Sequence, residues 1–362
     1  MSVDRVVIVG ASLAGLRCAQ ALRAKGFGGT IALHGDESSM PYDRPPLSKQ
    51  VLAGEWEPDR IPLADDATLD KLGLELHLGL PVGSIDEVGA YDALVVATGA
   101  RPRTIAGGLT LRTVGDSLAL RDRLRAASRV AVVGAGFIGA EVAAQARSMG
   151  REVTVLEALP QPLSRGLGEE VGAALGRLHT AKGVDLRCGV SVASIDDEGV
   201  HLADGSVVAA DVVVVGIGVV PNVEWLAGSD AEARDGVVCD ETLAVVGVPG
   251  AWAAGDVARW PHARYGEIRI EHWTNAVEQG QHVAGCILGD VKPFATVPFV
   301  WSDQYEHRIQ IVGRPDPTDA IRVVHGTLDA PPWAVEHMRD GEVTGVTGVD
   351  AVKVVMPYRR SL

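Results

Sequence analysis

One pattern occurs twice along the chain, and it limits the possible folds more than any other feature. Each copy reads as a strand, a glycine-rich turn, an alanine-rich helix, a second strand and an acid, over residues 5–37 and again over residues 129–158. Segments in this order form a parallel βαβ unit. Two copies predict an α/β chain with two Rossmann-like domains. The turn positions are Gly10, Ser12 and Gly15 in the first copy and Gly134, Gly136 and Gly139 in the second.

The residue types in these turns suit a dinucleotide. The first glycine allows the tight turn out of the strand, the second position lets the backbone approach a pyrophosphate, and the third lets helix and strand pack closely. The helix N-terminus then offers free N–H groups and the positive end of its dipole to the phosphates. The closing acid can accept hydrogen bonds from a ribose. Each copy is therefore predicted to bind a dinucleotide, although Ser12 stands where the second glycine of the first turn is expected.

Later segments complete the two domains and add a third. Three more strands end in small-residue turns, and a helix is expected over about residues 274–288. From about Pro293 onward the sequence alternates in strand-like stretches, which predicts a small α+β domain. We predict a discontinuous first domain (1–110 and 239–292), a second domain (111–238) and a C-terminal domain (293–362).

Charge and composition exclude several classes of partner. The net charge of −14 argues against nucleic acid and anionic membranes, which attract basic surfaces. The four cysteines form no C-x-x-C pair, and the histidines show no metal-ligand spacing, so we expect free buried thiols and no metal site. The N-terminus lacks the features of a signal peptide and no apolar run reaches membrane-spanning length, so a cytoplasmic protein is expected.

Several longer motifs resemble one family. They are P-Y-D-R-P-P-L-S-K at 41–49, L-R-T-V-G-D at 111–116, G-A-G-F-I-G-A-E-V-A-A at 134–144, E-H-W-T-N-A-V-E-Q at 271–279 and P-F-V-W-S-D-Q-Y at 298–305. With the two turns, they resemble the bacterial NADH-dependent ferredoxin reductases of oxygenase systems, of the putidaredoxin reductase and biphenyl dioxygenase ferredoxin reductase kind, which have a glutathione reductase-type fold. The resemblance spans nearly the whole chain. It implies FAD in the first domain and NAD(H) in the second.

The resemblance also implies which residues hold the cofactors. Asp36 would lie on the adenosine ribose of FAD, Asp256 on the ribityl chain and Trp273 by the pyrimidine edge of the flavin. The full FAD set implied is Gly10, Ser12, Leu13, Ala14, Gly15, Asp36, Glu37, Arg44, Lys49, Val82, Ala97, Thr98, Gly99, Arg112, Gly255, Asp256, His272, Trp273 and Trp301. The NAD set is Gly134, Gly136, Phe137, Ile138, Gly139, Glu141, Glu157, Arg165, Gly216, Ile217 and Gly218.

Two charged residues are the candidates for a catalytic role. In the resembling fold, a pair such as Lys49 and Glu141 lies under the flavin near N5, where the ammonium would stabilise negative charge on the reduced ring. Glu157 would bind the ribose hydroxyls of NADH and repel the 2′-phosphate of NADPH, since no Lys or Arg lies between Ala158 and Ser164. Trp301 is either at the flavin edge, near the electron exit, or a core tryptophan of the C-terminal domain.

The predicted partner is a small iron–sulfur ferredoxin, which takes electrons singly after hydride transfer from NADH to FAD. Such ferredoxins are generally acidic, so docking on a chain of charge −14 requires a local basic patch. Residues 259–362 hold 11 Lys and Arg against 13 Asp and Glu, which leaves −12 for the first 258 residues. The cations considered for the patch are Arg308, Arg314, Arg322, Arg339, Lys353, Arg359 and Arg360.

Two alternatives and two departures from the family pattern stay open. An NADH oxidase or disulfide reductase of the same fold would need a cysteine beside the flavin, and the 41–49 segment has none. A redox-sensing flavoprotein resembling apoptosis-inducing factor is an alternative of another class. The segment 82–91 is shorter than the family's usual β-meander, and the C-terminal domain is shorter than usual, which could alter the partner surface.

Overall fold

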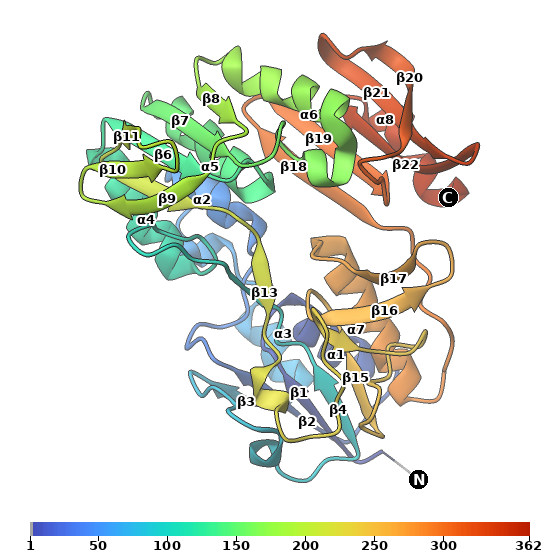
Figure 1. Ribbon diagram of the computed structural model, residues 1–362. Coiled ribbons are helices and arrows are strands. Elements are labelled where there is room, and N and C mark those ends of the chain that lie inside the picture. The colour runs from blue at the N-terminus through green and yellow to red at the C-terminus, as the bar shows by residue number, and fades with distance from the viewer. Residues whose placement is uncertain (1–2) are drawn as a thin grey trace. The chain divides into compact units, whose positions relative to one another are not determined.

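The computed structural model describes residues 3–362, and these form two compact units, each assembled from three separate stretches of chain (Figure 1). Unit 1 contains the described residues up to Asp43, Ile61–Arg101 and Val220–Pro298. Unit 2 contains Arg44–Arg60, Pro102–Val219 and Phe299–Leu362. The predicted domain boundaries near residues 110, 239 and 293 stay a prediction.

Unit 1 is built on a five-stranded parallel sheet in the order β15-β4-β1-β2-β3. Val, Ile, Leu and Ala fill its central strands, and these side chains are almost entirely buried, as expected where helices and loops cover both faces of a sheet. The strands are β1 (Arg5–Val9), β2 (Thr30–Gly35), β3 (Leu74–Leu78), β4 (Ala93–Val96) and β15 (Ala251–Ala253).

Two long helices of unit 1 pack closely against each other, α1 (Leu13–Ala24) and α7 (Trp273–Ile287). A side chain at Gly280 of α7 would put its Cβ 2.4 Å from the Ala14 carbonyl oxygen, so glycine is required at this crossing. The remaining elements are α3 (Asp66–Leu72), η3 (Ile85–Val88), η4 (Glu224–Leu226) and a three-stranded sheet of β14 (Val237–Val238), β16 (Ala258–His262) and β17 (Gly266–Arg269). Residues 82–91 contain the single turn η3 and no strand.

Unit 2 holds a second parallel sheet, in the order β12-β6-β7-β8, and two antiparallel sheets. The parallel strands are β6 (Arg129–Val133), β7 (Glu152–Glu157), β8 (Asp185–Cys188) and β12 (Val212–Val215). A small sheet consists of β9 (Val192–Asp196), β10 (Gly199–Leu202) and β11 (Val207–Ala209). The C-terminal sheet, drawn in orange and red in Figure 1, consists of β18 (Phe299–Gln304), β19 (His307–Gly313), β20 (Ala320–Thr327), β21 (Ala330–Arg339) and β22 (Glu342–Val349).

The C-terminal sheet shares a hydrophobic core with helix α6 (Ser164–Thr180) of the same unit. Leu167, Val171 and Leu175 of α6 pack on Ile309 and Trp333 of the sheet. The other helices of unit 2 are η1 (Pro45–Ser48), α2 (Gln50–Ala53), η2 (Pro58–Arg60), α4 (Val114–Ala126), α5 (Phe137–Ser148), α8 (Val352–Val355) and α9 (Tyr358–Ser361). Two of the connections between the units run through β5 (Ala100–Pro102) and β13 (Val219–Pro221), and these two strands pair with each other.

The predicted fold class is confirmed: two parallel sheets of Rossmann type and a β-rich C-terminal region. The expected helix over 274–288 is α7, displaced by one residue. All four cysteines are free, and three of them are buried as expected. The expectation is wrong for Cys188, which is half-exposed because it ends β8, the last strand of its sheet.

His337, buried in the C-terminal sheet, predicts a pH dependence of stability. Its ring lies within hydrogen-bond distance of Thr347 Oγ1 (2.8 Å from Nε2), and burial lowers its pKa to about 4, partly opposed by Asp319. The unfolded chain takes up this proton near pH 6.5, so stability is full above that pH and falls as the pH drops towards 4. Replacing His337 with leucine should reduce the loss of unfolding free energy between pH 7 and pH 5 by about 2 kcal/mol, measured by urea unfolding.

Exposed His325 on β20 provides the matched control, since its ring is in solvent in both states. His325→Leu should retain the wild-type pH dependence. An equal pH dependence in His337→Leu and in the wild type would show that His337 is not the group responsible.

Candidate functional site

The first glycine turn, in unit 1, leaves no room for a side chain at Gly10 or at Gly15. Gly10 has φ +123°, and a Cβ there would lie 2.0 Å from the Ala97 carbonyl oxygen. A Cβ on Gly15 would lie 2.1 Å from the Gly10 oxygen. Ser12 is the N-cap of α1, and its side chain makes no capping hydrogen bond. The first amides of α1 are therefore presented at a tight turn, as a bound pyrophosphate requires.

Three elements of unit 1 converge at the start of α1. Gly255, at the end of β15, has φ +83°, and a Cβ there would lie 3.1 Å from the Ala14 Cβ. The Gly255 N–H donates to Gln279 Oε1 on α7 at 2.8 Å, and Gln279 is fully buried. The turn before Asp256 is thus fixed against α1 and α7 together. Gln279 could not be predicted as a site residue, because nothing in a helix sequence shows that a side-chain amide will bond a turn 24 residues earlier.

The N-terminus of α7 carries an unsatisfied polar group. His272 is its N-cap, and the side chain makes no capping bond. Burial lowers the pKa of His272 to about 4, against the opposing effect of Asp256, so the ring is neutral at pH 7. Its buried Nδ1 has no hydrogen-bond partner among residues 3–362. The next residue, Trp273, donates its indole N–H to Asp43 Oδ1 at 2.7 Å, which fixes the ring.

The other predicted FAD residues of unit 1 occupy varied environments. Glu37 accepts a hydrogen bond from the Tyr42 hydroxyl just after β2. The Thr98 hydroxyl donates to the Asn222 carbonyl oxygen at 2.7 Å, and the Asn222 side-chain amide donates to the Thr98 carbonyl oxygen at 2.9 Å. These two bonds hold the segment after β4 against the segment after β13. Leu13 and Ala97 are buried, Val82 packs on the unit 1 core, Asp36 follows β2 directly, and Gly99 has φ +64°.

The second glycine turn, in unit 2, has the same construction as the first. A Cβ on Gly134 would lie 2.5 Å from the Gly216 oxygen, and one on Gly139 would lie 2.0 Å from the Gly134 oxygen. The N-cap of α5 is Gly136, which has no side chain to occupy the helix end. Glu157 ends β7, where one carboxylate oxygen accepts the Ala135 N–H at 2.6 Å and the other accepts the Leu159 N–H at 2.8 Å. The acid is thus held beside the turn.

Apolar side chains stand exposed around this turn. Ile138 on the first turn of α5 and Ile217 after β12 are both more than a third exposed, and Ile217 lies against the Gly134 position. Phe137 is half-buried against the core shared with α6. Arg165, in the first turn of α6, is exposed, and Gly218 has φ +96°. Exposed isoleucines beside amide donors give unit 2 both the apolar and the polar contacts that a dinucleotide can use.

The two candidate catalytic residues form a buried ion pair in unit 2. Lys49 follows η1 and Glu141 lies on α5, with the ammonium 2.7 Å from Glu141 Oε2 and side chains only 13% and 4% exposed. The Ser48 hydroxyl donates to the same oxygen, and the Ser302 hydroxyl donates to Oε1 at 2.7 Å. Lys49 also donates to the Pro45 carbonyl oxygen at 3.3 Å. Among residues 3–362 its third N–H has no acceptor, and it is available to a ligand.

Three further predicted residues also lie in unit 2. Arg44 Nη1 donates to the Arg112 carbonyl oxygen at 2.7 Å, and Asp116 accepts the Arg112 N–H at 3.0 Å. Trp301 on β18 is half-buried and stacks on Phe299, with ring centroids 6.0 Å apart.

Sequence reasoning missed both serines that bind Glu141. Ser48 precedes Lys49 in the same motif, and Ser302 follows Trp301, so both stood beside singled-out residues. What the sequence does not contain is a signal that residues 93 and 161 positions from Glu141 would meet its carboxylate.

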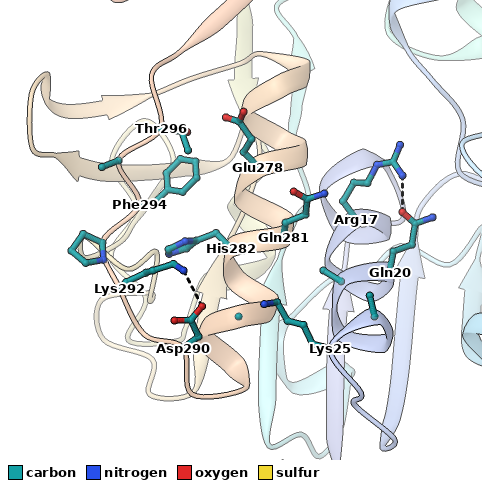
Figure 2. Close-up of a pocket in the computed structure, with 15 residues that line it drawn as sticks. Arg17, Gln20, Lys25, Glu278, Gln281, His282, Asp290, Lys292, Phe294 and Thr296 are labelled. Atoms are coloured by element: carbon teal, nitrogen blue, oxygen red, sulfur yellow. Dashed lines mark hydrogen bonds and ion pairs between the residues drawn. The ribbon is translucent and has the colours of Figure 1, made fainter. Parts of the chain in front are cut away.

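A shallow hollow of about 670 Å³ opens elsewhere on unit 1, beside the later turns of α1 and the second half of α7 (Figure 2). Its lining mixes charges of both signs, including Arg17, Lys25 and Glu278, and Lys292 pairs with Asp290 at 2.9 Å. None of the predicted site residues lines it. Within residues 3–362, no cluster of three or more His, Cys, Asp or Glu side chains could hold a metal ion.

Both glycine turns therefore fit the dinucleotides that the sequence implies. Each combines close backbone approach, uncapped helix amides and a nearby acid, and unit 1 adds a neutral buried histidine with an unused nitrogen. In the described part of the chain, no helix is both long and apolar enough to span a membrane.

Comparison with known proteins agrees with this geometry. Residues 4–280 match the family model described as pyridine nucleotide-disulphide oxidoreductase, and residues 299–362 match the reductase C-terminal model. The chain is 36% identical to rhodocoxin reductase of Rhodococcus erythropolis (99% of this chain, 89% of the relative). It is equally identical to the ferredoxin–NAD(+) reductase component of the p-cumate 2,3-dioxygenase system of Pseudomonas putida (99% and 93%).

A solved structure is similar over nearly the same length. The covalent complex of putidaredoxin reductase with putidaredoxin matches with a TM-score of 0.91 at 33% identity, covering 99% of this chain and 92% of that one. The expected family and the expected cofactors are confirmed. The chain belongs to the pyridine nucleotide-disulphide oxidoreductase family and is a FAD- and NAD(H)-dependent oxidoreductase.

Proposed function

We propose that the chain is an NADH-dependent ferredoxin reductase that supplies an oxygenase. The observation that carries the proposal is the pair of glycine turns, each with uncapped helix amides, in a chain whose relatives include the reductase component of a dioxygenase system. FAD, when bound, takes two electrons as a hydride from NADH and can release them one at a time, which an iron–sulfur acceptor requires. The protein itself would bind the two cofactors, orient them and provide charge near the flavin.

Each glycine turn, together with its acid, would bind one of the two cofactors. Gly10, Ser12 and Gly15 with the α1 amides would hold the FAD pyrophosphate, and Asp36 its ribose. The corresponding residues of unit 2, with Glu157, would hold NADH. The N-terminus of α7, with its positive dipole end and the neutral His272, would lie at the flavin, where negative charge develops on reduction. The remaining predicted FAD and NAD contacts are proposed in the same roles.

Lys49 and Glu141 are the proposed catalytic pair. An ammonium at the flavin stabilises the negative charge of the reduced ring, and it does so more strongly in a buried site than in water. Glu141 lies in that environment with both oxygens hydrogen-bonded, so it can hold the Lys49 ammonium in one place. The free third N–H of Lys49 is the group proposed to face the cofactor.

The disulfide-reductase alternative lacks a suitable thiol. The thiolate is the reactive form of cysteine, and burial raises the pKa of Cys18 and of Cys239 to about 12. Burial also raises the pKa of Cys286 and, with nearby Glu157, that of Cys188. The four free thiols suit a reducing compartment, so we propose that the enzyme works in the cytoplasm.

Part of the proposed docking surface for ferredoxin is the C-terminal cationic cluster, defined as Lys353, Arg359 and Arg360. Other cations of the C-terminal region are neutralised nearby: Arg308 pairs with Asp303, Arg322 with Glu336 and Arg339 with Asp319. Exposed Lys353 and Arg360 have no ion-pair partner among residues 3–362. Within this cluster, Arg359 lies over the Phe299 ring at 5.2 Å, and Phe299 in turn stacks on Trp301.

The acid at the end of β7 predicts the choice of nucleotide. A carboxylate about 4 Å from a 2′-phosphate repels it by up to about 4 kcal/mol at an effective dielectric of 20, and screening of the phosphate by ions in solution weakens this. We expect NADH to be preferred over NADPH by on the order of 10²-fold in kcat/KM. Glu157→Gln should raise kcat/KM for NADPH by about tenfold in steady-state assays with a dye acceptor.

Glu152→Gln, at the opposite end of the same strand, is the matched control and should leave the preference unchanged. Equal use of both nucleotides by the wild type would show that Glu157 does not bind the ribose.

The cationic cluster predicts where ferredoxin kinetics are sensitive to charge. Lys353→Glu/Arg360→Glu should raise the KM for ferredoxin at least about fivefold at low salt, with a smaller effect as added salt screens the charges. The assay is ferredoxin-dependent cytochrome c reduction across a salt series, with NADH-to-dye activity as the reference.

Lys71→Glu/Arg123→Glu changes two exposed cations elsewhere by the same amount, and it should have little effect. If both double variants raise the KM equally, only net charge matters and this docking surface is wrong. If no ferredoxin of the same cell accepts electrons, the proposed acceptor is wrong, while the use of FAD and NADH stands.

A further inference from the structure

A chain of hydrogen bonds connects the turn between β18 and β19 to the buried Glu141 carboxylate, entirely within unit 2. It runs from the Tyr305 hydroxyl to His179 Nδ1 (3.0 Å), from His179 Nε2 to Gln304 Oε1 (3.0 Å), from Gln304 Nε2 to Ser302 Oγ (3.2 Å), and from Ser302 Oγ to Glu141 Oε1 (2.7 Å). The four residues His179, Gln304, Ser302 and Glu141 are all at least 95% buried. We call this set the His179 chain.

The chemistry of the groups gives every bond one direction. The amide oxygen of Gln304 can only accept, so His179 must donate from Nε2. Burial lowers the pKa of His179, so the ring is neutral and its Nδ1 must accept from the Tyr305 hydroxyl. Each donor thus points towards Glu141, whose carboxylate is the final acceptor. Such aligned hydrogen bonds polarise one another.

The outer end of the chain is held in an unusual backbone conformation. Tyr305 has φ +57°, in the left-handed region that bulky residues rarely occupy. Tyr305 is the first residue of the two-residue turn that joins Gln304 to His307, and tight hairpin turns require this conformation. The Tyr305 ring meets the His179 ring edge-on, with centroids 5.4 Å apart, and the Lys182 ammonium lies 5.6 Å from the Tyr305 ring centre. These contacts direct the hydroxyl to His179.

We infer that His179 is a positioning residue for Lys49: through Gln304 and Ser302 it fixes the Glu141 carboxylate, and that carboxylate fixes the ammonium. The inference rests on the proposed function for the role of Lys49 at the flavin. His179 itself touches neither Lys49 nor the carboxylate. Glu141 receives Lys49 and Ser48 on one oxygen and the His179 chain on the other, so loss of the chain leaves Oε1 without its oriented donor and frees the carboxylate to rotate.

The chain orients groups and does not carry protons. An amide donates from nitrogen and accepts at oxygen, so Gln304 cannot pass a proton from His179 to Ser302 without changing into a high-energy tautomer. The effect of His179 is therefore on the position of charge and on the rate of flavin reduction.

Rapid mixing of the FAD-loaded enzyme with NADH, without any ferredoxin, tests this role. His179→Leu should slow flavin reduction about three- to tenfold, the range that one neutral hydrogen bond supports, with the Kd for NADH unchanged. His179→Gln can donate and accept in a similar way and should recover the rate to within about twofold. The matched control is His337→Leu, which replaces another buried histidine of the same unit outside the chain and should leave the rate unchanged.

A double-mutant cycle with Glu141→Gln separates positioning from general destabilisation. If His179 acts through Glu141, adding His179→Leu to Glu141→Gln should cost little further rate, and the shifts in the urea unfolding midpoint should be non-additive. A His179→Leu rate equal to that of His337→Leu, or rate effects that multiply independently, would overturn the inference. If His179→Leu does not fold, Tyr305→Phe takes its place. We then expect flavin reduction to slow at least about twofold, and an unchanged rate would contradict the inference.

The two proposals fail in different ways. A wild-type flavin that NADH does not reduce would refute the proposed function, and the urea cycle, which needs no flavin, would still decide the His179 chain. Additive midpoint shifts would then overturn the chain, and non-additive shifts would support it.

Discussion

The close approach of backbone to backbone at the two glycine turns is the constraint on which the rest of the structure depends. At Gly10, Gly15, Gly134 and Gly139 a single added carbon would lie 2.0–2.5 Å from a carbonyl oxygen. Because glycine has no Cβ, the first strand of each copy, the helix that follows it and the end of the neighbouring strand can meet at one point. The same absence of side chains exposes the helix amides, so what permits the fold also prepares the anion sites.

A second, independent device is the buried carboxylate of Glu141. Burying a charge costs free energy unless it is paired and hydrogen-bonded, and here Lys49, Ser48 and Ser302 provide the partners. These partners come from η1 and β18, so one side chain of α5 holds three separate stretches of unit 2 together. The same pairing that limits the cost of burial also restricts the ammonium to one position, which is the property a charge-stabilising group needs.

The sequence predicted what depends on local pattern. The glycine spacing, the strand ends and the alternation after Pro293 were sufficient for both parallel sheets, α7 and the C-terminal strands, and the motifs correctly singled out Lys49 with Glu141 as a pair. It did not predict Gln279 at the Gly255 turn or His179 behind Glu141, since both act across long separations. The sequence also suggested more unpaired cations in the C-terminal region than the structure has, because ion pairs such as Arg308 with Asp303 form only in the folded sheet.

The most direct test of the central claim is an anaerobic titration of the purified protein followed by visible absorption. The protein should carry one tightly bound FAD per chain, and NADH should bleach the flavin absorption. Oxidised iron–sulfur ferredoxin should then restore it with two equivalents of ferredoxin per flavin, as single-electron release requires. A colourless protein that takes up no FAD on reconstitution, or a bound flavin that NADH does not bleach, would contradict the account.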